Sequence, residues 1–276
     1  MADITVRKIR FTFEDPIDFD ASEAERGEIL PALGLSMTMP YLEPYLIRTM
    51  KVALKAITNP PLAEDVRRFC QQEGHHYRNH ALFNHQIRAQ FDAATADGLR
   101  GIEAALEADY QRFNREKSLR FNVAYAEGFE AMTCAGALAA AEHGAFEGAG
   151  MPGGEIWAWH MVEEIEHRTV AFDVYQHLVG SYPYRILAGT WAQWHYVSYV
   201  RRFALCMGRG LGWKKIRTKS SPMRRSALRR YLHTWSPRYD PAKIEIPDGV
   251  QELLAKYSAL AERAASVPPT LPERLA

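Results

Sequence analysis

The stretch His160-Met161-Val162-Glu163-Glu164-Ile165-Glu166-His167 decides the fold, together with the earlier stretch Glu73-Gly74-His75-His76. Both contain the pattern Glu-x-x-His, and both lie within long runs of helix-forming residues. On a helix, residues three apart point the same way, so each pattern directs a carboxylate and an imidazole at one spot. Two such patterns, with one Glu from each of two further helices, form the ligand set of a dinuclear metal site inside a four-helix bundle.

Gly and Pro divide the chain into the helices that such a bundle requires. The segments between these residues are dense in Ala, Leu, Glu, Arg and Gln, as long helices are. Asn59 suits a helix cap, and Pro60 suits the first turn that follows it. Four long helices are predicted. The first ends at about residue 57, and the others cover about residues 62–95, 117–147 and 154–179. A minor helix is predicted near 100–115.

These segments predict an all-α protein, a ferritin-like four-helix bundle with an N-terminal arm and extra C-terminal helices. The first ~20 residues have the composition of an extended arm. We expect a single domain over residues 1–276, with the bundle at about 20–180 and a helical extension wrapping it at 181–276. Within the extension, the segment from Thr218 to Pro247 predicts an irregular wrap.

Carboxylates stand on the buried side of each predicted bundle helix. Residues at alternating spacings of three and four form largely apolar stripes, each interrupted by a glutamate. Burying an unpaired carboxylate is so costly that such groups are normally paired, protonated or bound to metal. Arginines do not fall on the same stripes. Two divalent cations would offset four carboxylates, with the histidines as neutral ligands.

The sequence therefore predicts seven metal ligands. They are Glu43, Glu73, His76, Glu130, His160, Glu164 and His167. Glu127 lies one turn before Glu130 on the same face and is the alternative to it. His160 stands one turn before Glu164, where it is either a seventh ligand or a packing histidine that supports one.

Other residues near these patterns have simpler interpretations. His80 follows His76 by one turn and is expected to support a ligand rather than bind metal. Glu163 and Glu166 flank the ligands and are expected to be solvated, with a supporting contact to a ligand as the alternative. Pro44 places Glu43 in the first turn of its helix or at a kink. The remaining side chains singled out are expected at the surface or in the core: His75, His85, His143, His177, Arg78, Arg168, Trp157, Trp159 and Tyr125.

Composition excludes several classes of protein. The 276 residues are 47% hydrophobic and 24% charged with a formal net charge of +1, which does not favour a nucleic-acid partner. Three cysteines without paired spacing fit a reducing compartment, and no signal peptide is evident, so a cytoplasmic location is expected. The aromatic strip from Tyr184 to Met207 is interrupted by charges, which favours a buried or interfacial helix over membrane contact.

Four segments together resemble a known family. They are Pro40-Tyr41-Leu42-Glu43, Phe69-Cys70-Gln71-Gln72-Glu73-Gly74-His75-His76, Glu130-Ala131-Met132-Thr133 and His160 to His167 followed by Ala171-Phe172-Asp173. The chain resembles the bacterial family named predicted metal-dependent hydrolase over roughly residues 5 to 245. The order of the ligands is also similar to that in ferritin-like di-iron p-aminobenzoate N-oxygenases.

The resemblance and the ligand set lead to two predictions of function. The first is an O2-activating enzyme that holds two iron ions and oxidises or oxygenates a small organic substrate with the help of an electron donor. The alternative is a dinuclear hydrolase acting on a small ester, amide or phosphoester, with manganese or zinc as other candidate metals. Basic groups near the site would favour the hydrolase. A homodimer is compatible with either function.

Overall fold

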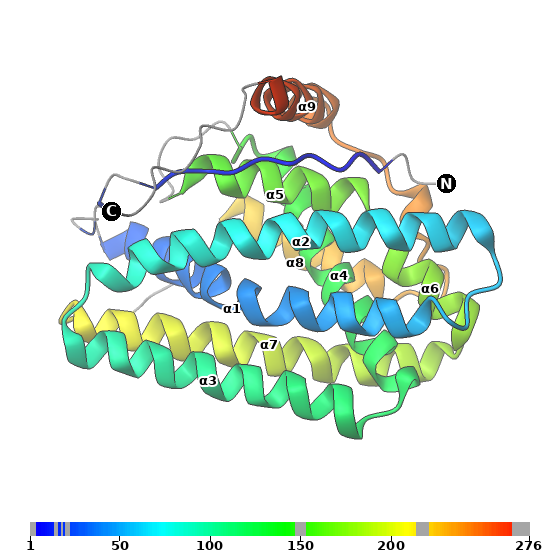
Figure 1. Cartoon of the computed structure of the whole chain (residues 1–276), viewed down its shortest axis with the longest axis horizontal. Coiled ribbons are helices and arrows are strands. Elements are labelled where there is room, and N and C mark those ends of the chain that lie inside the picture. The colour runs from blue at the N-terminus through cyan, green and yellow to red at the C-terminus, as the bar shows by residue number, and fades with distance from the viewer. Residues whose placement is uncertain are drawn as a thin grey trace, which may run out of the picture.

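The computed structural model describes residues 4–13, 16–17, 19, 23–146, 153–213 and 221–266 (Figure 1). All regular structure within these residues is helical, which confirms the predicted all-α class. The elements are α1 (Glu23–Ala53), α2 (Pro60–Ala89), α3 (Ala93–Glu116), α4 (Leu119–Glu142), α5 (Gly154–Glu166), α6 (Val170–Leu178), α7 (Tyr182–Gly210), α8 (Pro222–Thr234), the 3-10 turn η1 (Pro241–Lys243) and α9 (Val250–Ser266).

The structure corrects three of the predicted elements. The minor helix near 100–115 is a full helix, α3, of 24 residues. The helix predicted over 154–179 is two helices, because the chain leaves the helical path after Glu166 and re-enters it at Val170. The predicted irregular wrap contains α8, whose first turn is capped by the Ser221 side chain.

Local signals place the helix starts. The Asn59 side chain accepts a hydrogen bond from the Leu62 amide at 3.1 Å, and Pro60 stands in the first turn, as predicted. Asp92 and Ser118 cap α3 and α4 in the same way. Glu43 lies in the middle of α1, which continues through Pro44, so the predicted position in a first turn is wrong.

Four helices enclose the candidate site. α1 packs against α2, α2 against α5, α5 against α4, and α4 against α1, which closes a ring. α7 packs on both α1 and α4, with α3 beside it along one edge of the molecule (Figure 1). The segment after residue 181 is therefore a structural part of the bundle as well as a cover. The ferritin-like topology and the single domain stay predictions.

The N-terminal arm, residues 4–13, runs across α5 between α2 and α9 (Figure 1). Asn79 on α2 holds it by two hydrogen bonds, since its side chain accepts from the Phe11 amide and donates to the Ile9 carbonyl, both at 2.9 Å. Ile4, Arg7 and Ile9 are buried. The arm is thus fixed against the helices that carry the two Glu-x-x-His patterns.

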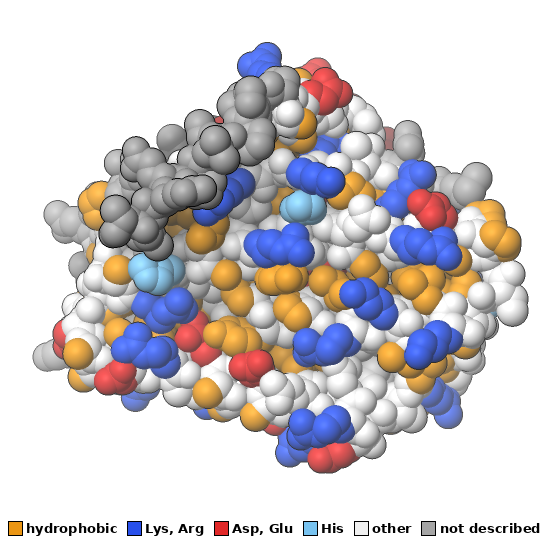
Figure 2. All heavy atoms as spheres, viewed as in Figure 1, with side chains coloured by type: hydrophobic (Ala, Val, Ile, Leu, Met, Phe, Trp, Pro, Cys, Tyr) orange, Lys and Arg blue, Asp and Glu red, His pale blue; other side chains and the backbone are white. Residues whose placement is uncertain are grey.

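The outer surface of the bundle carries mixed charge. Figure 2 shows Lys and Arg side chains spread among apolar ones over the face that carries α2. α7, which contains the aromatic strip, buries Tyr196 and Phe203 and exposes Leu187 and Trp194. Among the described helices, none combines the length and the apolar composition needed to cross a membrane.

Replacing Gly128 with Ala should destabilise the protein by about 3 kcal/mol, because a Cβ there would lie 2.4 Å from the Gly189 Cα at the crossing of α4 and α7. Neither the α4 backbone nor the α7 backbone can shift easily to relieve this clash. Gly136→Ala on the same helix is the matched control, since its Cβ would meet nothing within 4 Å. We expect this control to gain about 0.5–1 kcal/mol. Urea unfolding of both variants checks the prediction, and equal effects would contradict it.

Candidate metal centre

The structure brings all seven predicted ligands together between α1, α2, α4 and α5. They are Glu43, Glu73, His76, Glu130, His160, Glu164 and His167. None is more than 3% exposed. Six of them form two groups of three residues. Within each group, one carboxylate oxygen or ring nitrogen from each residue lies within 4.8 Å of the corresponding atoms of the other two. The seventh, Glu130, adjoins the second group.

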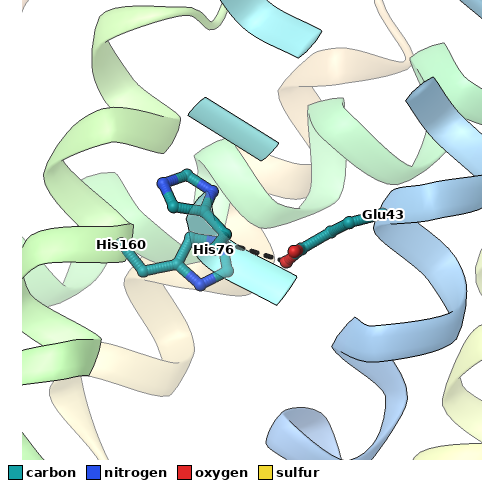
Figure 3. Close-up of side chains that lie close together, drawn as sticks. All are labelled: Glu43, His76 and His160. Carbon is teal, nitrogen blue, oxygen red and sulfur yellow. Dashed lines mark ion pairs between the residues drawn. The ribbon is translucent and has the colours of Figure 1, made fainter. Parts of the chain in front are cut away.

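The first group contains Glu43 from α1, His76 from α2 and His160 from α5. Figure 3 shows the Glu43 carboxylate reaching from α1 toward the two imidazoles. Its Oε1 lies 3.6 Å from the His160 Nε2. The two imidazole rings are stacked with centroids 4.1 Å apart. One carboxylate and two imidazoles thus face a common point.

The second group contains Glu73 from α2, with Glu164 and His167 from the end of α5. The His167 Nε2 lies 3.5 Å from one oxygen of each of these carboxylates. Glu130 from α4 brings its Oε2 to 3.3 Å from the same nitrogen. The imidazole therefore stands among three carboxylates.

The carboxylates of Glu73 and Glu164 each lie close to ring nitrogens of both groups. Glu73 Oε1 lies 3.5 Å from the His167 Nε2 and 3.7 Å from the His76 Nδ1. Glu164 places Oε1 at 2.9 Å from the His160 Nε2 and Oε2 at 3.5 Å from the His167 Nε2. Glu73 and Glu164 are therefore placed to bridge two cations.

Most of the facing atoms have no hydrogen-bond partner, the exceptions being at His160 and Glu164, whose Nε2 and Oε1 lie 2.9 Å apart. Seven buried atoms of this cluster lack a partner: both carboxylate oxygens of Glu43 and of Glu73, the Glu130 Oε1, the His76 Nδ1 and the His167 Nε2. Buried polar atoms in native proteins are normally paired, so such a concentration calls for a bound group. Four carboxylates and three imidazoles fit two divalent cations in charge and in donor type.

Glu163 and Arg7 orient His76. The His76 Nε2 donates to the Glu163 carboxylate at 2.9 Å, so in the neutral ring that a metal requires the lone pair of Nδ1 faces the cluster. Glu163 in turn accepts from Arg7 at 3.1 Å and from the Trp159 indole at 3.0 Å. The positive charge of Arg7 in the N-terminal arm therefore holds the Glu163 carboxylate, which in turn fixes the orientation of the His76 imidazole.

A second partner orients His167. The Gln72 amide nitrogen donates to the Thr5 carbonyl and to Glu166, so its oxygen is the acceptor that faces the His167 Nδ1 at 2.9 Å. In the neutral ring that a metal requires, Nδ1 is then the protonated nitrogen, and the Nε2 lone pair points at the carboxylates.

A longer chain of hydrogen bonds orients His160. The Ser36 hydroxyl donates to the Asn84 side-chain oxygen at 2.6 Å and accepts from the His80 Nδ1 at 2.8 Å. The His80 Nε2 must then accept, at 2.8 Å, from the His160 Nδ1. This leaves the His160 Nε2 lone pair facing the cluster, as a ligand requires. It also gives His80 the supporting place that the sequence predicted.

The structure separates Glu127 from the cluster. Its Oε1 accepts from the Arg185 guanidinium at 2.8 Å, and both side chains are buried. Within the described part of the chain, no arginine or lysine pairs with Glu130, and one of its oxygens lacks a hydrogen bond. Of the two alternatives, Glu130 is the one in contact with the candidate ligands.

The expectation that Glu163 and Glu166 are solvated is wrong. The Glu163 side chain is fully buried and that of Glu166 is 8% exposed, since both accept hydrogen bonds from Arg7. Sequence reasoning missed Arg7 and Gln72 altogether, because no local pattern ties the arm to α5. Of the expected surface arginines, Arg78 is exposed, and Arg168 donates to the Ile165 and Pro241 carbonyls.

Burial raises the pKa of Glu43 well above its ordinary value near 4.5, and the neighbouring carboxylates of Glu73, Glu164 and Glu130 raise it further. A carboxyl group with a raised pKa in the folded state stabilises the protein below the unfolded pKa. That contribution is lost as pH rises through the folded pKa. Metal-free protein should therefore lose stability through Glu43 above about pH 4.5.

Glu43→Gln should accordingly stabilise the metal-free protein relative to wild type, by about 1–3 kcal/mol at pH 8 and by much less near pH 5. In metal-loaded protein the Glu43→Gln variant should instead be less stable than wild type, because it lacks a ligand. Urea unfolding with and without a chelator across this pH range measures both effects. Glu64→Gln, on the exposed side of α2, is the control. A difference that does not grow with pH would contradict the account of Glu43.

Fold and site together define an all-α protein with two buried groups of Glu and His suited to metal ions. The chain matches the family described as predicted metal-dependent hydrolase over residues 5–245, and it belongs to that family. This confirms the resemblance seen in the sequence. Comparison with curated proteins and with solved structures gave no match.

Proposed function

We propose that the protein is a dinuclear metal-dependent hydrolase that acts on a small ester, amide or phosphoester. The observation that carries this proposal is the set of seven buried ligand atoms that face one another without hydrogen-bond partners. Membership of a family described as metal-dependent hydrolase supports the class of reaction.

We assign Glu43, His76 and His160 to one cation and His167 with Glu130 to the other. Glu73 and Glu164 would bridge the two, since each approaches nitrogens of both groups. Two bridged divalent cations supply Lewis-acid polarisation of a substrate oxygen and lower the pKa of a water molecule. Iron was the first expectation from the ligand set, and zinc or manganese suits hydrolysis equally well.

The chain's own residues keep the centre rigid and dry. The Thr133 hydroxyl donates to the Glu164 Oε2 at 3.0 Å, which holds one proposed bridging carboxylate in place. Trp159 packs edge-on against the His76 ring at 4.8 Å and closes that side to water. Electrostatic interactions at such a site are stronger than in water, because the local dielectric is low.

Elemental analysis of the purified chain tests the proposal. Two metal ions per chain, with turnover of p-nitrophenyl esters or phosphates that is lost on chelation and regained with zinc or manganese, would support it. Turnover must be independent of O2. Absence of metal after reconstitution with zinc, manganese and anaerobic iron would refute the metal centre, and two bound metals without any hydrolysis would refute the reaction.

A second candidate function, O2 activation by two irons, is favoured by one further observation. The Tyr125 hydroxyl lies 2.9 Å from the His195 Nδ1, and the His195 Nε2 lies 3.2 Å from the Asp109 carboxylate. Tyr196, fully buried, interacts electrostatically with Glu43 and Glu164 of the cluster and with Tyr125. A phenol bonded to imidazole is suited to proton-coupled electron transfer between the centre and the surface.

Iron and O2 separate the two candidates. Iron-loaded protein that consumes O2 in the presence of a reductant, and loses that reaction in Tyr125→Phe but not in a surface variant, would favour oxidation. Hydrolysis that is unaffected by Tyr125→Phe would indicate that Tyr125 only packs in the core. A small-molecule substrate is required in both cases, and an electron donor only in the oxidative one.

A further inference from the structure

A cavity of about 280 Å³ lies between α8 and α4, the helix that also carries Glu130 of the candidate metal centre. Its volume is close to the lower end of the range for small-ligand sites. Ala131, Ala135 and Leu138 of α4 form its apolar floor, with Tyr239 and Ile244 completing the wall. None of these groups offers a charge, so the floor suits the apolar body of an organic molecule.

The cavity adjoins the centre through α4. Ala131 directly follows Glu130, and Cys134, which also lines the cavity, stands one turn further along the same helix. Thr133, the neighbour of Cys134 in the chain, donates its hydroxyl to the Glu164 Oε2 at 3.0 Å. The cavity wall and the proposed centre therefore share the stretch of α4 from Glu130 to Cys134.

The rim of the cavity is cationic. Arg229, Arg230 and His233, all from α8, line it, and Arg229 and His233 are exposed to solvent. Arg230 is paired with Glu142 through one terminal nitrogen, but its Nε is buried without a hydrogen-bond partner. A buried guanidinium N–H without a partner is suited to donate a hydrogen bond to an anionic oxygen.

We propose that this cavity binds a small organic anion, with its carboxylate or phosphate at Arg229, Arg230 and His233 and its apolar body against α4. This inference rests on the proposed function in treating that anion as the substrate of the metal centre. It supplies the basic groups near the site that a hydrolase for anionic substrates needs.

Binding to the zinc-loaded full chain tests the proposal without measuring turnover. Benzoate and phenyl phosphate are the probes, which separate a carboxylate from a phosphate head, and benzyl alcohol is the neutral control. Isothermal titration should show binding of at least one anion and much weaker binding of the alcohol. Arg229→Gln should weaken anion binding about tenfold, the effect of losing one charged hydrogen bond.

Ala135→Leu should weaken the binding of both probes at least as much, because the longer side chain fills the floor. Arg115→Gln on α3, outside the cavity lining, removes the same charge and should leave binding unchanged. Circular dichroism and metal content are measured on each sample. Failure of both anions to bind, or binding that neither cavity variant weakens, would overturn the proposal.

Metal content separates this inference from the proposed function. Full zinc content without anion binding would refute the cavity proposal and would not contradict the proposed dinuclear centre. Anion binding that is sensitive to Arg229, in a chain that takes up no metal, would uphold the cavity and refute the metal centre.

Discussion

Glu164→Ala is expected to reduce the metal content of the protein from about two ions per chain to one or none, while its far-UV circular dichroism stays that of a helical protein. Glu164 contacts ring nitrogens of both groups, at 2.9 Å for His160 and 3.5 Å for His167. Its removal therefore takes a ligand from both cations. Metal affinity should fall at least about 100-fold, since even changes beyond the ligands cost 10- to 100-fold.

Glu73→Ala should have the same effect for the same reason, as both of its oxygens are buried and its Oε1 lies near a ring nitrogen of each group. Glu64→Ala on the exposed side of α2 is the matched control, and we expect it to keep the full metal content. Plasma mass spectrometry on dialysed samples gives the measurement. A full complement of metal in either variant would show that the assignment of the bridging carboxylates is wrong.

The sequence contained enough information to place the metal-binding faces of the helices. Helical spacing determines which side chains share a face, so Glu73 and His76, or His160 and Glu164, had to point together wherever the helices packed. The cost of burying carboxylates then led to the prediction that the four acidic faces meet at cations. The structure brings these residues into contact, although the identity of the metal stays a prediction.

What the sequence did not reveal depends on contacts between distant segments. Arg7 meets Glu163 across 156 positions, and Gln72 meets His167 across 95. No periodicity relates an extended arm to a helix face. Likewise, the break between α5 and α6 contains neither Gly nor Pro, so no local residue type marks it. Arg229 and Arg230 of α8, which line the cavity, were likewise not singled out from the sequence, where only Arg78 and Arg168 were considered and were expected at the surface.

The choice between Glu127 and Glu130 leads to a second large effect. Arg185 is 4% exposed and donates to Glu127 at 2.8 Å and to the Thr234 carbonyl at 2.7 Å. Among the described residues, no other carboxylate lies within ion-pair distance of it. Arg185→Ala would leave a carboxylate buried without its cation. Burial already raises the pKa of Glu127, and loss of Arg185 would raise it further. We expect a loss of about 3–5 kcal/mol in the free energy of unfolding.

The double variant Glu127→Gln/Arg185→Met should recover most of that stability, because replacing both members of a buried ion pair by neutral groups is often nearly neutral. It should also keep its full metal content, since neither residue belongs to the proposed centre. Glu130→Gln should show the opposite pattern, with stability retained in the metal-free state and metal lost. Urea unfolding and metal analysis of these variants distinguish a structural carboxylate from a ligand one turn away. Metal loss in the double variant would reverse the assignment and make Glu127 the ligand.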